Sequence, residues 1–179
     1  EPDHLKLDKE IEKILEKKNI PFKFFKGNIL NEYQSITKND GTPFKVFSPF
    51  WRNAEQVFLD AVPQKTSEIK KLKSKKTLFN SKDNFKQIMP KKDWFKKFDQ
   101  YWKPSEDEAH KSLKEFISNR ISKYGVDRDY PSINGSSKLS PYIRNGQIHV
   151  AAIYEKSSKD IKKNTSIRKY INELGWREF

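Results

Sequence analysis

The residues between Tyr124 and Gly146 have the types and spacing needed to hold a phosphate group. Asn134-Gly135 is a turn dipeptide, and its glycine allows the backbone to approach a ligand closely. Small hydroxyl residues, a lysine and a leucine follow: Ser136, Ser137, Lys138, Leu139 and Ser140. Ser140-Pro141 is a typical helix start with the serine as N-cap, and a helix N-terminus beside hydroxyls and a lysine favours a phosphate or pyrophosphate. Taken alone, these residues also fit a capped helix after an ordinary loop.

A second group of chemically capable side chains lies at the C-terminus. Tyr170, Glu173 and Arg177 are three and four residues apart and therefore share a helix face, which Trp176 adjoins next to Glu173. A Glu–Arg pair one turn apart is most often a surface ion pair. The same set also suits a base flipped out of its stack, with Trp176 stacking on the ring, Glu173 bonding to its edge and Arg177 contacting an anion.

Two helices must position these groups. A capping box at Ser105 and Glu108 begins the first helix. Its apolar residues recur at helical spacing: Ala109, Leu113, Phe116, Ile117, Ile121 and Tyr124. This helix is expected to bring Tyr124 beside the Gly135 turn. The second helix is expected to begin near Thr165. Its apolar stripe consists of Ile167, Ile171 and Leu174.

The first 62 residues have the pattern of an α/β layer. Residues 8–18 place apolar side chains at helical spacing and predict a helix. Residues 21–26 and 44–47 predict two short strands, and Ser48-Pro49 predicts the start of another helix. Helix, strand, strand, helix is the order expected for the closing part of such a layer.

The stretch from residue 63 to residue 104 lacks a sustained period and predicts a linker. It contains a run of lysines: Lys70, Lys71, Lys73, Lys75 and Lys76. Such a run is usually a solvated face, and the alternative is an arm that contacts phosphates. Aromatic residues near Trp94 and Tyr101 are expected to anchor the linker to the protein surface.

Composition narrows the class of partner. The 179 residues carry a formal net charge of +13, which favours nucleic acid, although a lysine-rich solvated surface explains the charge equally well. Without cysteine there are no disulfides or thiolate metal sites, and three scattered histidines predict no metal site. No apolar run reaches the ~18 residues of a membrane span, and a cytoplasmic location is expected. Since the only methionine is Met89 and Phe179 ends inside a helical pattern, we expect a piece of a longer chain.

Three segments can be read together. They are D-G-T-P-F-K-V-F-S-P-F-W-R (40–52), R-D-Y-P followed by G-S-S-K-L-S-P-Y-I-R-N-G (128–146), and N-E-L-G-W-R-E-F (172–179). In this order they resemble the DNA photolyase/cryptochrome family, and within it the bacterial (class I) cyclobutane pyrimidine dimer photolyases. The chain departs from many relatives at Ser136-Ser137-Lys138, where Thr-Ser-Arg is common. Lysine carries a compact ammonium charge in place of the planar guanidinium of arginine, which can form two parallel hydrogen bonds. Tyr170 also stands where tryptophan is common.

The resemblance implies a fold and a function. Residues 1–62 would be the end of a Rossmann-like α/β antenna domain, 63–104 an interdomain linker, and 105–179 the start of an all-α FAD-binding domain. The implied reaction is light-driven splitting of cyclobutane pyrimidine dimers, with FAD as electron donor and damaged DNA, its dimer flipped out, as partner. A second antenna chromophore of folate or deazaflavin type in the full-length protein and a monomeric state are also implied.

The resemblance assigns roles residue by residue and names no catalytic residue in this segment. The residues expected to contact FAD are Tyr124, Ser136, Ser137, Lys138, Leu139, Ser140 and Tyr170. Those expected to face DNA or the lesion are Arg128, Glu173, Trp176 and Arg177. Because much of the family's flavin pocket lies beyond Phe179, the chain alone is expected to bind FAD weakly or not at all.

Two other functions remain open at this point. A cryptochrome-like blue-light photoreceptor would share the fold and the flavin, but Glu173 and Trp176 weigh against it, since repair requires contacts to a dimer and signalling does not. A basic nucleic-acid-binding module without flavin would explain the net charge of +13 but not the ordered motifs.

Overall fold

The structure of the chain is a computed structural model that describes residues 2–23, 27, 29–31, 35–58 and 90–179. The side chains of residues 2–4 and 58 are not included in that description. Most of the predicted linker, with its lysine run between residues 70 and 76, therefore lies outside the described residues.

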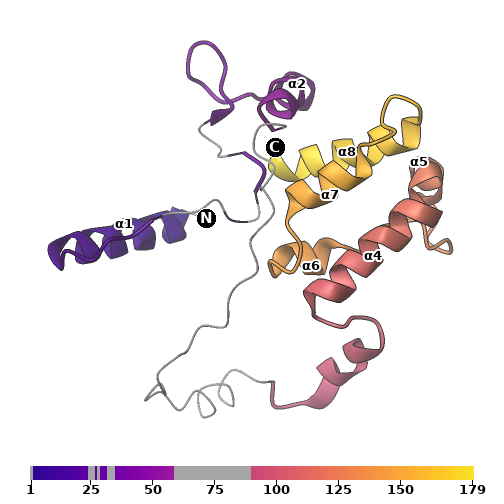
Figure 1. Cartoon of the computed structure of the whole chain (residues 1–179), viewed down its shortest axis with the longest axis horizontal. Helices are drawn as coiled ribbons and strands as arrows, with labels where there is room; N and C mark the ends of the chain where they lie inside the picture. Colours follow the sequence, from indigo (N-terminus) through magenta and orange to yellow (C-terminus); the bar gives the residue numbers. More distant parts are fainter. Residues whose placement is uncertain (1, 24–26, 28, 32–34, 59–89) are drawn as a thin grey trace.

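The C-terminal part of the chain folds into a helical body (Figure 1). Its helices, in chain order, are α4 (Glu106–Asn119), η4 (Ile121–Lys123), α5 (Tyr124–Asp127), α6 (Ser140–Arg144), α7 (Val150–Ser157) and α8 (Thr165–Glu178). The last helix is central, because α8 packs against α5, η4, α7 and also against α2 (Phe47–Phe58) from the N-terminal part. This arrangement confirms the helical class predicted for residues 105–179.

The apolar stripes predicted from helical spacing form the core of this body. Leu113 and Phe116 of α4 and Ile171 of α8 are fully buried, and Ile153 of α7 lies among them. Burying a side chain of this size stabilises a fold by about 1.5–3 kcal/mol, so these positions account for much of the packing between the helices.

The first helix begins as predicted and ends earlier. The Ser105 hydroxyl accepts a hydrogen bond from the Glu108 backbone N–H at 3.2 Å, which confirms the cap. The prediction of one helix reaching Tyr124 is wrong, because α4 ends at Asn119 and the chain continues through the short η4 and α5. Tyr124 is buried all the same, with 9 % of its surface exposed.

The N-terminal part holds helices but no named strand among its described residues. The helix predicted for residues 8–18 is confirmed as α1 (Pro2–Lys17), and α2 begins at Phe47, one residue before the predicted start. The strand predicted for residues 44–47 is wrong, since those residues lead directly into α2. Residues 21–23 form no strand either, and residues 24–26 lie outside the described residues. The α/β layer expected for residues 1–62 is therefore not confirmed.

The one β pairing among the described residues is an isolated antiparallel bridge between Thr37 and Pro43. The Asp40-Gly41 turn closes it, with the Thr42 N–H donating to the Asp40 carboxylate at 2.9 Å. A strand forms only where a neighbouring edge satisfies its backbone, and proline lacks the N–H that a ladder needs. The bridge accordingly does not extend.

Two peripheral elements complete the described chain. In Figure 1, α1 projects away from the helical body, and its apolar side chains at Leu5, Leu7, Ile11 and Ile14 are exposed. Within the predicted linker, η3 (Asp93–Gln100) is described. Of the aromatic residues expected to anchor the linker, Trp102 packs against the core, whereas Trp94 and Tyr101 are exposed. In the described part of the chain no helix has both the length and the apolar character required to cross a bilayer.

Candidate functional site

A cavity of about 350 Å³ brings together most residues of the two motifs. It lies where the loop before α6 faces α8 and the start of α5. Its lining residues are Tyr124, Ser136, Ser137, Lys138, Ser140, Ile143, Tyr170, Glu173, Leu174 and Arg177. The lining residues of the loop before α6 and of the helix α8, at least thirty residues apart in the sequence, thus share one concave surface that mixes hydroxyls, charges and aromatic rings.

Arg120, which follows the last residue of α4, binds the backbone of the loop formed by residues 134–136. One terminal nitrogen of Arg120 donates to the carbonyls of Asn134 at 3.3 Å and Ser136 at 3.1 Å, and the other donates to the Glu115 carboxylate at 3.3 Å. The Arg120 side chain is only 14 % exposed. No sequence pattern singled out Arg120, because its contacts join residues that only the fold brings together.

Gly135 has a different role from the one predicted. A Cβ atom built on Gly135 would lie 2.6 Å from the carbonyl carbon of Asp127, far inside normal contact distance. The glycine therefore allows the loop to approach the backbone of α5. The expected close approach exists, but its partner is this chain rather than a ligand.

Lys138 adopts the left-handed backbone conformation, with φ of +56°. This conformation costs a residue with a Cβ roughly 1 kcal/mol and is otherwise left to glycine. Such strain concentrates at binding sites, where the surrounding structure holds it. Lys138 lines both this cavity and an adjoining one of about 400 Å³ formed by residues 128–138.

The start of α6 differs slightly from the expectation. The helix begins at Ser140, the N-cap position belongs to Leu139, and no side chain caps the end. Leu139 is 1 % exposed and belongs to the core, so it is the predicted cofactor residue that does not reach the cavity. Because α6 spans only five residues, its dipole contributes little. The groups that could bind a phosphate here are therefore the serine hydroxyls and Lys138, not the helix dipole.

Aromatic rings form the floor of the cavity. The Tyr124 and Tyr170 ring centroids are 5.1 Å apart, and Phe116 lies 4.7 Å from Tyr170. Burial raises the pKa of Tyr170 to about 12, while a hydrogen bond with the Ser137 side chain acts in the opposite direction. Tyr170 is therefore neutral at physiological pH and presents an uncharged ring and hydroxyl beside the loop.

Arg128 and Glu173 were both expected to face DNA, and the structure joins them to each other. Arg128 Nη1 donates to Glu173 Oε1 at 2.5 Å, and the Arg128 guanidinium lies 5.5 Å from the centre of the Tyr124 ring. The hydrogen bond to Glu173 is the main reason why the pKa of Arg128 is raised further above its ordinary value. The pair is about one third exposed and borders both cavities.

Arg177 also has a partner other than the predicted one. Its Nη1 donates to the Glu178 carboxylate, and Glu173 and Arg177 form no ion pair in the described contacts. The Glu178 side chain is 3 % exposed, and it also accepts the Leu30 N–H at 2.8 Å. Glu178 thus ties the N-terminal part to the end of α8, a role that its position in the motif did not reveal.

Trp176 lies away from the cavity. Its ring stacks on Phe47 with centroids 3.9 Å apart and planes 8° from parallel, and Phe179 meets its edge at 5.7 Å. The sequence had placed Trp176 beside Glu173, but the structure turns it toward α2. Half of its surface remains exposed, so its second face is open to a partner.

Comparisons with known proteins agree on one family. Residues 1–69 match the family model described as DNA photolyase. A deoxyribodipyrimidine photo-lyase of Alkalihalophilus pseudofirmus is 32% identical over 96% of this chain and 36% of its own length. One from Agrobacterium fabrum is 30% identical over 100% of this chain and 38% of its own length. The crystal structure of a bacterial class III photolyase from Agrobacterium tumefaciens superposes with a TM-score of 0.78 at 26% identity, covering 99% of this chain and 37% of that one. The chain therefore spans somewhat over a third of the length of these relatives.

Proposed function

The chain belongs to the DNA photolyase family, and on that premise we propose that it is part of a deoxyribodipyrimidine photo-lyase that repairs DNA in light. The observation that carries the proposal is the convergence of both motifs on one cavity next to a strained, basic loop. The relatives named above are described as photo-lyases, which favours repair over the photoreceptor alternative.

The residues around the cavity fit FAD. Ser136, Ser137, Ser140 and Lys138 offer hydroxyls and a positive charge to a pyrophosphate from a loop whose carbonyls are engaged by Arg120. The Tyr124 and Tyr170 rings, with Ile143 and Leu174, offer apolar surface to a ring system. When bound, reduced FAD supplies the light-driven donation of one electron to a pyrimidine dimer. The task of this chain is then to bind and orient the cofactor and the lesion.

The lesion would lie against the end of α8, between the cavity that Glu173 lines and the exposed face of Trp176. The Glu173 carboxylate can accept hydrogen bonds from a flipped pyrimidine, and its pair with Arg128 holds it in place and balances its charge. Trp176 can stack on the lesion with its exposed face, because Phe47 supports the other face. Arg177, anchored by Glu178, supplies a cation beside the cavity.

The wider protein follows from the same proposal. The formal net charge of +13 suits the phosphates of damaged DNA. We further propose that cyclobutane dimers are the lesion, that the enzyme acts as a cytoplasmic monomer, and that the full-length protein carries a folate or deazaflavin antenna. The class I assignment stays a prediction, as the solved relative named above is a class III photolyase.

The test uses the full-length protein. It is photoreduced and given an oligonucleotide with one thymine cyclobutane dimer, and loss of the dimer under blue light is followed. Repair should fall in Trp176→Ala and persist in Trp94→Ala, a control at a tryptophan of similar exposure, 58 % against 52 %, in η3. A flavin-loaded protein that leaves the dimer intact would contradict the proposal.

A further inference from the structure

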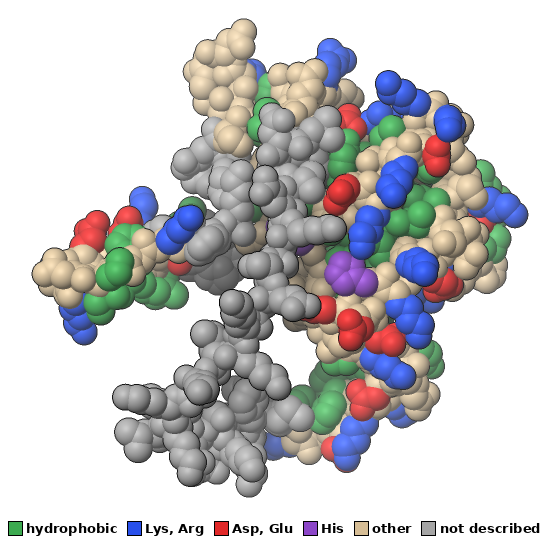
Figure 2. All heavy atoms as spheres, in the orientation of Figure 1, with side chains coloured by type: hydrophobic (Ala, Val, Ile, Leu, Met, Phe, Trp, Pro, Cys, Tyr) green, Lys and Arg blue, Asp and Glu red, His purple; other side chains and the backbone are tan. Residues whose placement is uncertain are grey.

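Arg120 lies outside both motifs, between the end of α4 and the start of η4, and lines neither the flavin cavity nor the adjoining one. On the face of the helical body seen in Figure 2, Lys and Arg side chains stand out at the surface. Arg120 is different, because its side chain is only 14 % exposed. An enclosed guanidinium depends on protein partners instead of water, and the partners of Arg120 lead to the flavin cavity.

The first partners are backbone carbonyls of the loop before α6. Arg120 Nη1 donates to the carbonyls of Asn134 at 3.3 Å and Ser136 at 3.1 Å. Nη2 donates to the Glu115 carboxylate at 3.3 Å, which fixes the plane of the guanidinium against α4. A planar, forked guanidinium can make these contacts at once, whereas a lysine ammonium is a point charge on a flexible stem. Arg120 therefore holds the loop against α4 by its geometry as well as its charge.

The other partner of Arg120 belongs to the floor of the cavity. The central guanidinium carbon lies 5.6 Å from the centre of the Phe116 ring, within the range of a cation–π contact. Phe116 is fully buried, and its ring centroid is 4.7 Å from that of Tyr170, which lines the cavity. The loop and the aromatic floor thus share one support.

The contact to the Ser136 carbonyl also sets the direction of the next backbone N–H. No peptide bond among the described residues is cis, and in a planar trans peptide the carbonyl of one residue and the N–H of the next point in opposite directions. The Ser137 N–H therefore points away from Arg120, and it has no hydrogen-bond partner among the described residues. Lys138 and Leu139 follow with left- and right-handed backbone conformations, an alternation that turns successive N–H groups toward one anion.

We propose that Arg120 is a positioning residue for the cofactor. By binding the loop carbonyls from outside the cavity, it directs the Ser137 N–H and Lys138 toward the phosphates of FAD. This role rests on the proposed function, because it takes FAD as the ligand of the cavity. Since Arg120 touches neither cofactor nor lesion, it sets how tightly FAD is held and leaves the chemistry of bound FAD unchanged.

The test measures FAD affinity in the full-length protein. The holoenzyme is diluted, and release of FAD is followed by the rise in flavin fluorescence. Arg120→Lys keeps the charge but loses the fork, and Arg120→Met loses both. Each variant should bind FAD about tenfold more weakly than the wild-type protein, because the loop is no longer preorganised. Wild-type affinity in Arg120→Lys would show that positive charge alone is sufficient and would overturn the proposal.

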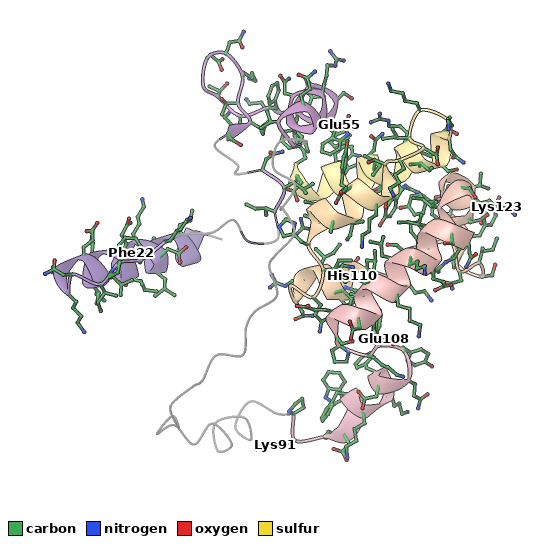
Figure 3. The ribbon with its side chains drawn as sticks, in the orientation of Figure 1. Phe22, Glu55, Lys91, Glu108, His110 and Lys123 are labelled. Carbon is green, nitrogen blue, oxygen red and sulfur yellow. The ribbon has the colours of Figure 1, made fainter. Side chains whose placement is uncertain are left out.

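Arg168→Lys is the matched control. Arg168 also donates to a carboxylate, that of Glu55, and its replacement removes a guanidinium contact between helices without affecting the loop. In Figure 3, Glu55 on α2 lies well apart from Lys123, the η4 residue three positions after Arg120. This variant should bind FAD as the wild-type protein does. An equal loss of affinity in Arg120→Lys and Arg168→Lys would assign the effect to general destabilisation and would overturn the specific role.

Phosphorus NMR of the FAD-saturated proteins separates positioning from a purely structural role. The pyrophosphate resonances of FAD should shift in Arg120→Lys and stay in place in Arg168→Lys. Light-driven repair per bound flavin should be the same in both variants and in the wild-type protein. Unchanged phosphorus resonances in Arg120→Lys, or a fall in its repair per bound flavin, would contradict the assigned role.

This proposal and the proposed function fail in different ways. A wild-type protein that retains no FAD would overturn the proposed function, and the role of Arg120 with it. A wild-type protein that holds FAD and repairs the dimer, beside Arg120 variants that hold FAD equally tightly, would overturn the role of Arg120 alone.

Discussion

The two sides of α8 differ in what they contact. Toward α2, the helix is closely packed: Gly175 lies against the Trp51 ring, and Trp176 stacks on Phe47. Arg168 on the same side donates to both oxygens of the Glu55 carboxylate, at 2.7 and 3.0 Å. The Tyr154 hydroxyl donates to the same carboxylate at 3.1 Å, so that α2, α7 and α8 meet at one acid.

Toward the cavity, the same helix is less enclosed. Tyr170, Glu173 and Arg177 border open volume and the strained loop at Lys138. The difference teaches that packing and binding are separable on a single helix. Substitutions at the buried contacts of the α2 side should change the free energy of unfolding, and those on the cavity side should change ligand affinity. The half-exposed Trp176 packs on α2 and also offers a face to the lesion, so its substitution should change both.

The largest effect on stability is expected at Gly175. A Cβ atom there would lie 2.6 Å from the Trp51 ring, which is buried and cannot move aside freely. Gly175→Ala should therefore lower the free energy of unfolding by about 1–3 kcal/mol, measured by urea denaturation. Gly27→Ala is the control, because a Cβ at Gly27 meets nothing within 4 Å. Equal stability of the two variants would show that α2 and α8 are not closely packed.

Tyr170 should make stability fall in alkali. Its pKa is about 12 in the fold and 10.0 in its ordinary state, so the unfolded chain releases the proton first. The neutral Tyr170 therefore adds on the order of 2 kcal/mol to the free energy of unfolding at pH values below about 10. This stabilisation is lost as the pH rises from about 10 to about 12. Tyr170→Phe should reduce this slope in urea denaturation at a series of pH values. Tyr124 and Tyr154, whose pKa values are also raised by burial, would account for the remaining slope.

The control for this pH series is Tyr101→Phe, at a tyrosine that is 76 % exposed. That variant should follow the wild-type curve. If Tyr170→Phe follows it too, Tyr170 is not buried in the floor of the cavity as the structure shows.

Lys138→Gly should separate strain from binding. Glycine relieves the φ of +56°, so the free energy of unfolding should rise by at most about 1 kcal/mol. FAD affinity of the full-length protein should fall about tenfold, because a charged contact to phosphate is lost. Asn19→Gly relieves a φ of +53° far from the cavity and should leave FAD affinity unchanged. Equal FAD affinity in both variants would show that Lys138 does not contact the cofactor.

The smallest effects on stability distinguish two glutamates. Glu55→Gln weakens the contacts to Arg168 and Tyr154 and should cost about 0.5–1 kcal/mol, because these side chains are partly exposed. Glu173→Gln should cost less than about 0.5 kcal/mol yet weaken dark binding of an oligonucleotide with a thymine dimer. Each variant serves as the other's control. Weaker dimer binding by Glu55→Gln alone would reverse the roles of the two sides of α8.

The sequence by itself determined most of the longer helices and several of the residues that line the cavity. Helical hydrogen bonds and apolar stripes join residues three and four positions apart, so the Ser105 cap and the buried Leu113, Phe116 and Ile171 could be predicted. The resemblance of short segments to a family assigned Ser136, Ser137, Lys138 and Tyr170 to FAD and Glu173 to the lesion, and these five residues line one cavity. Leu139, Arg128 and Trp176, which were assigned with them, do not line it.

Only the tertiary structure decided which residues meet across the chain. The Arg120 contacts to the loop, the Glu178 contact to Leu30 and the stacking of Trp176 on Phe47 depend on how the helices pack, and no local period encodes them. Whether a segment forms a strand also depends on the tertiary structure. Residues 44–47 have the composition of a strand, but a strand also requires a partner edge, and here these residues lead into α2.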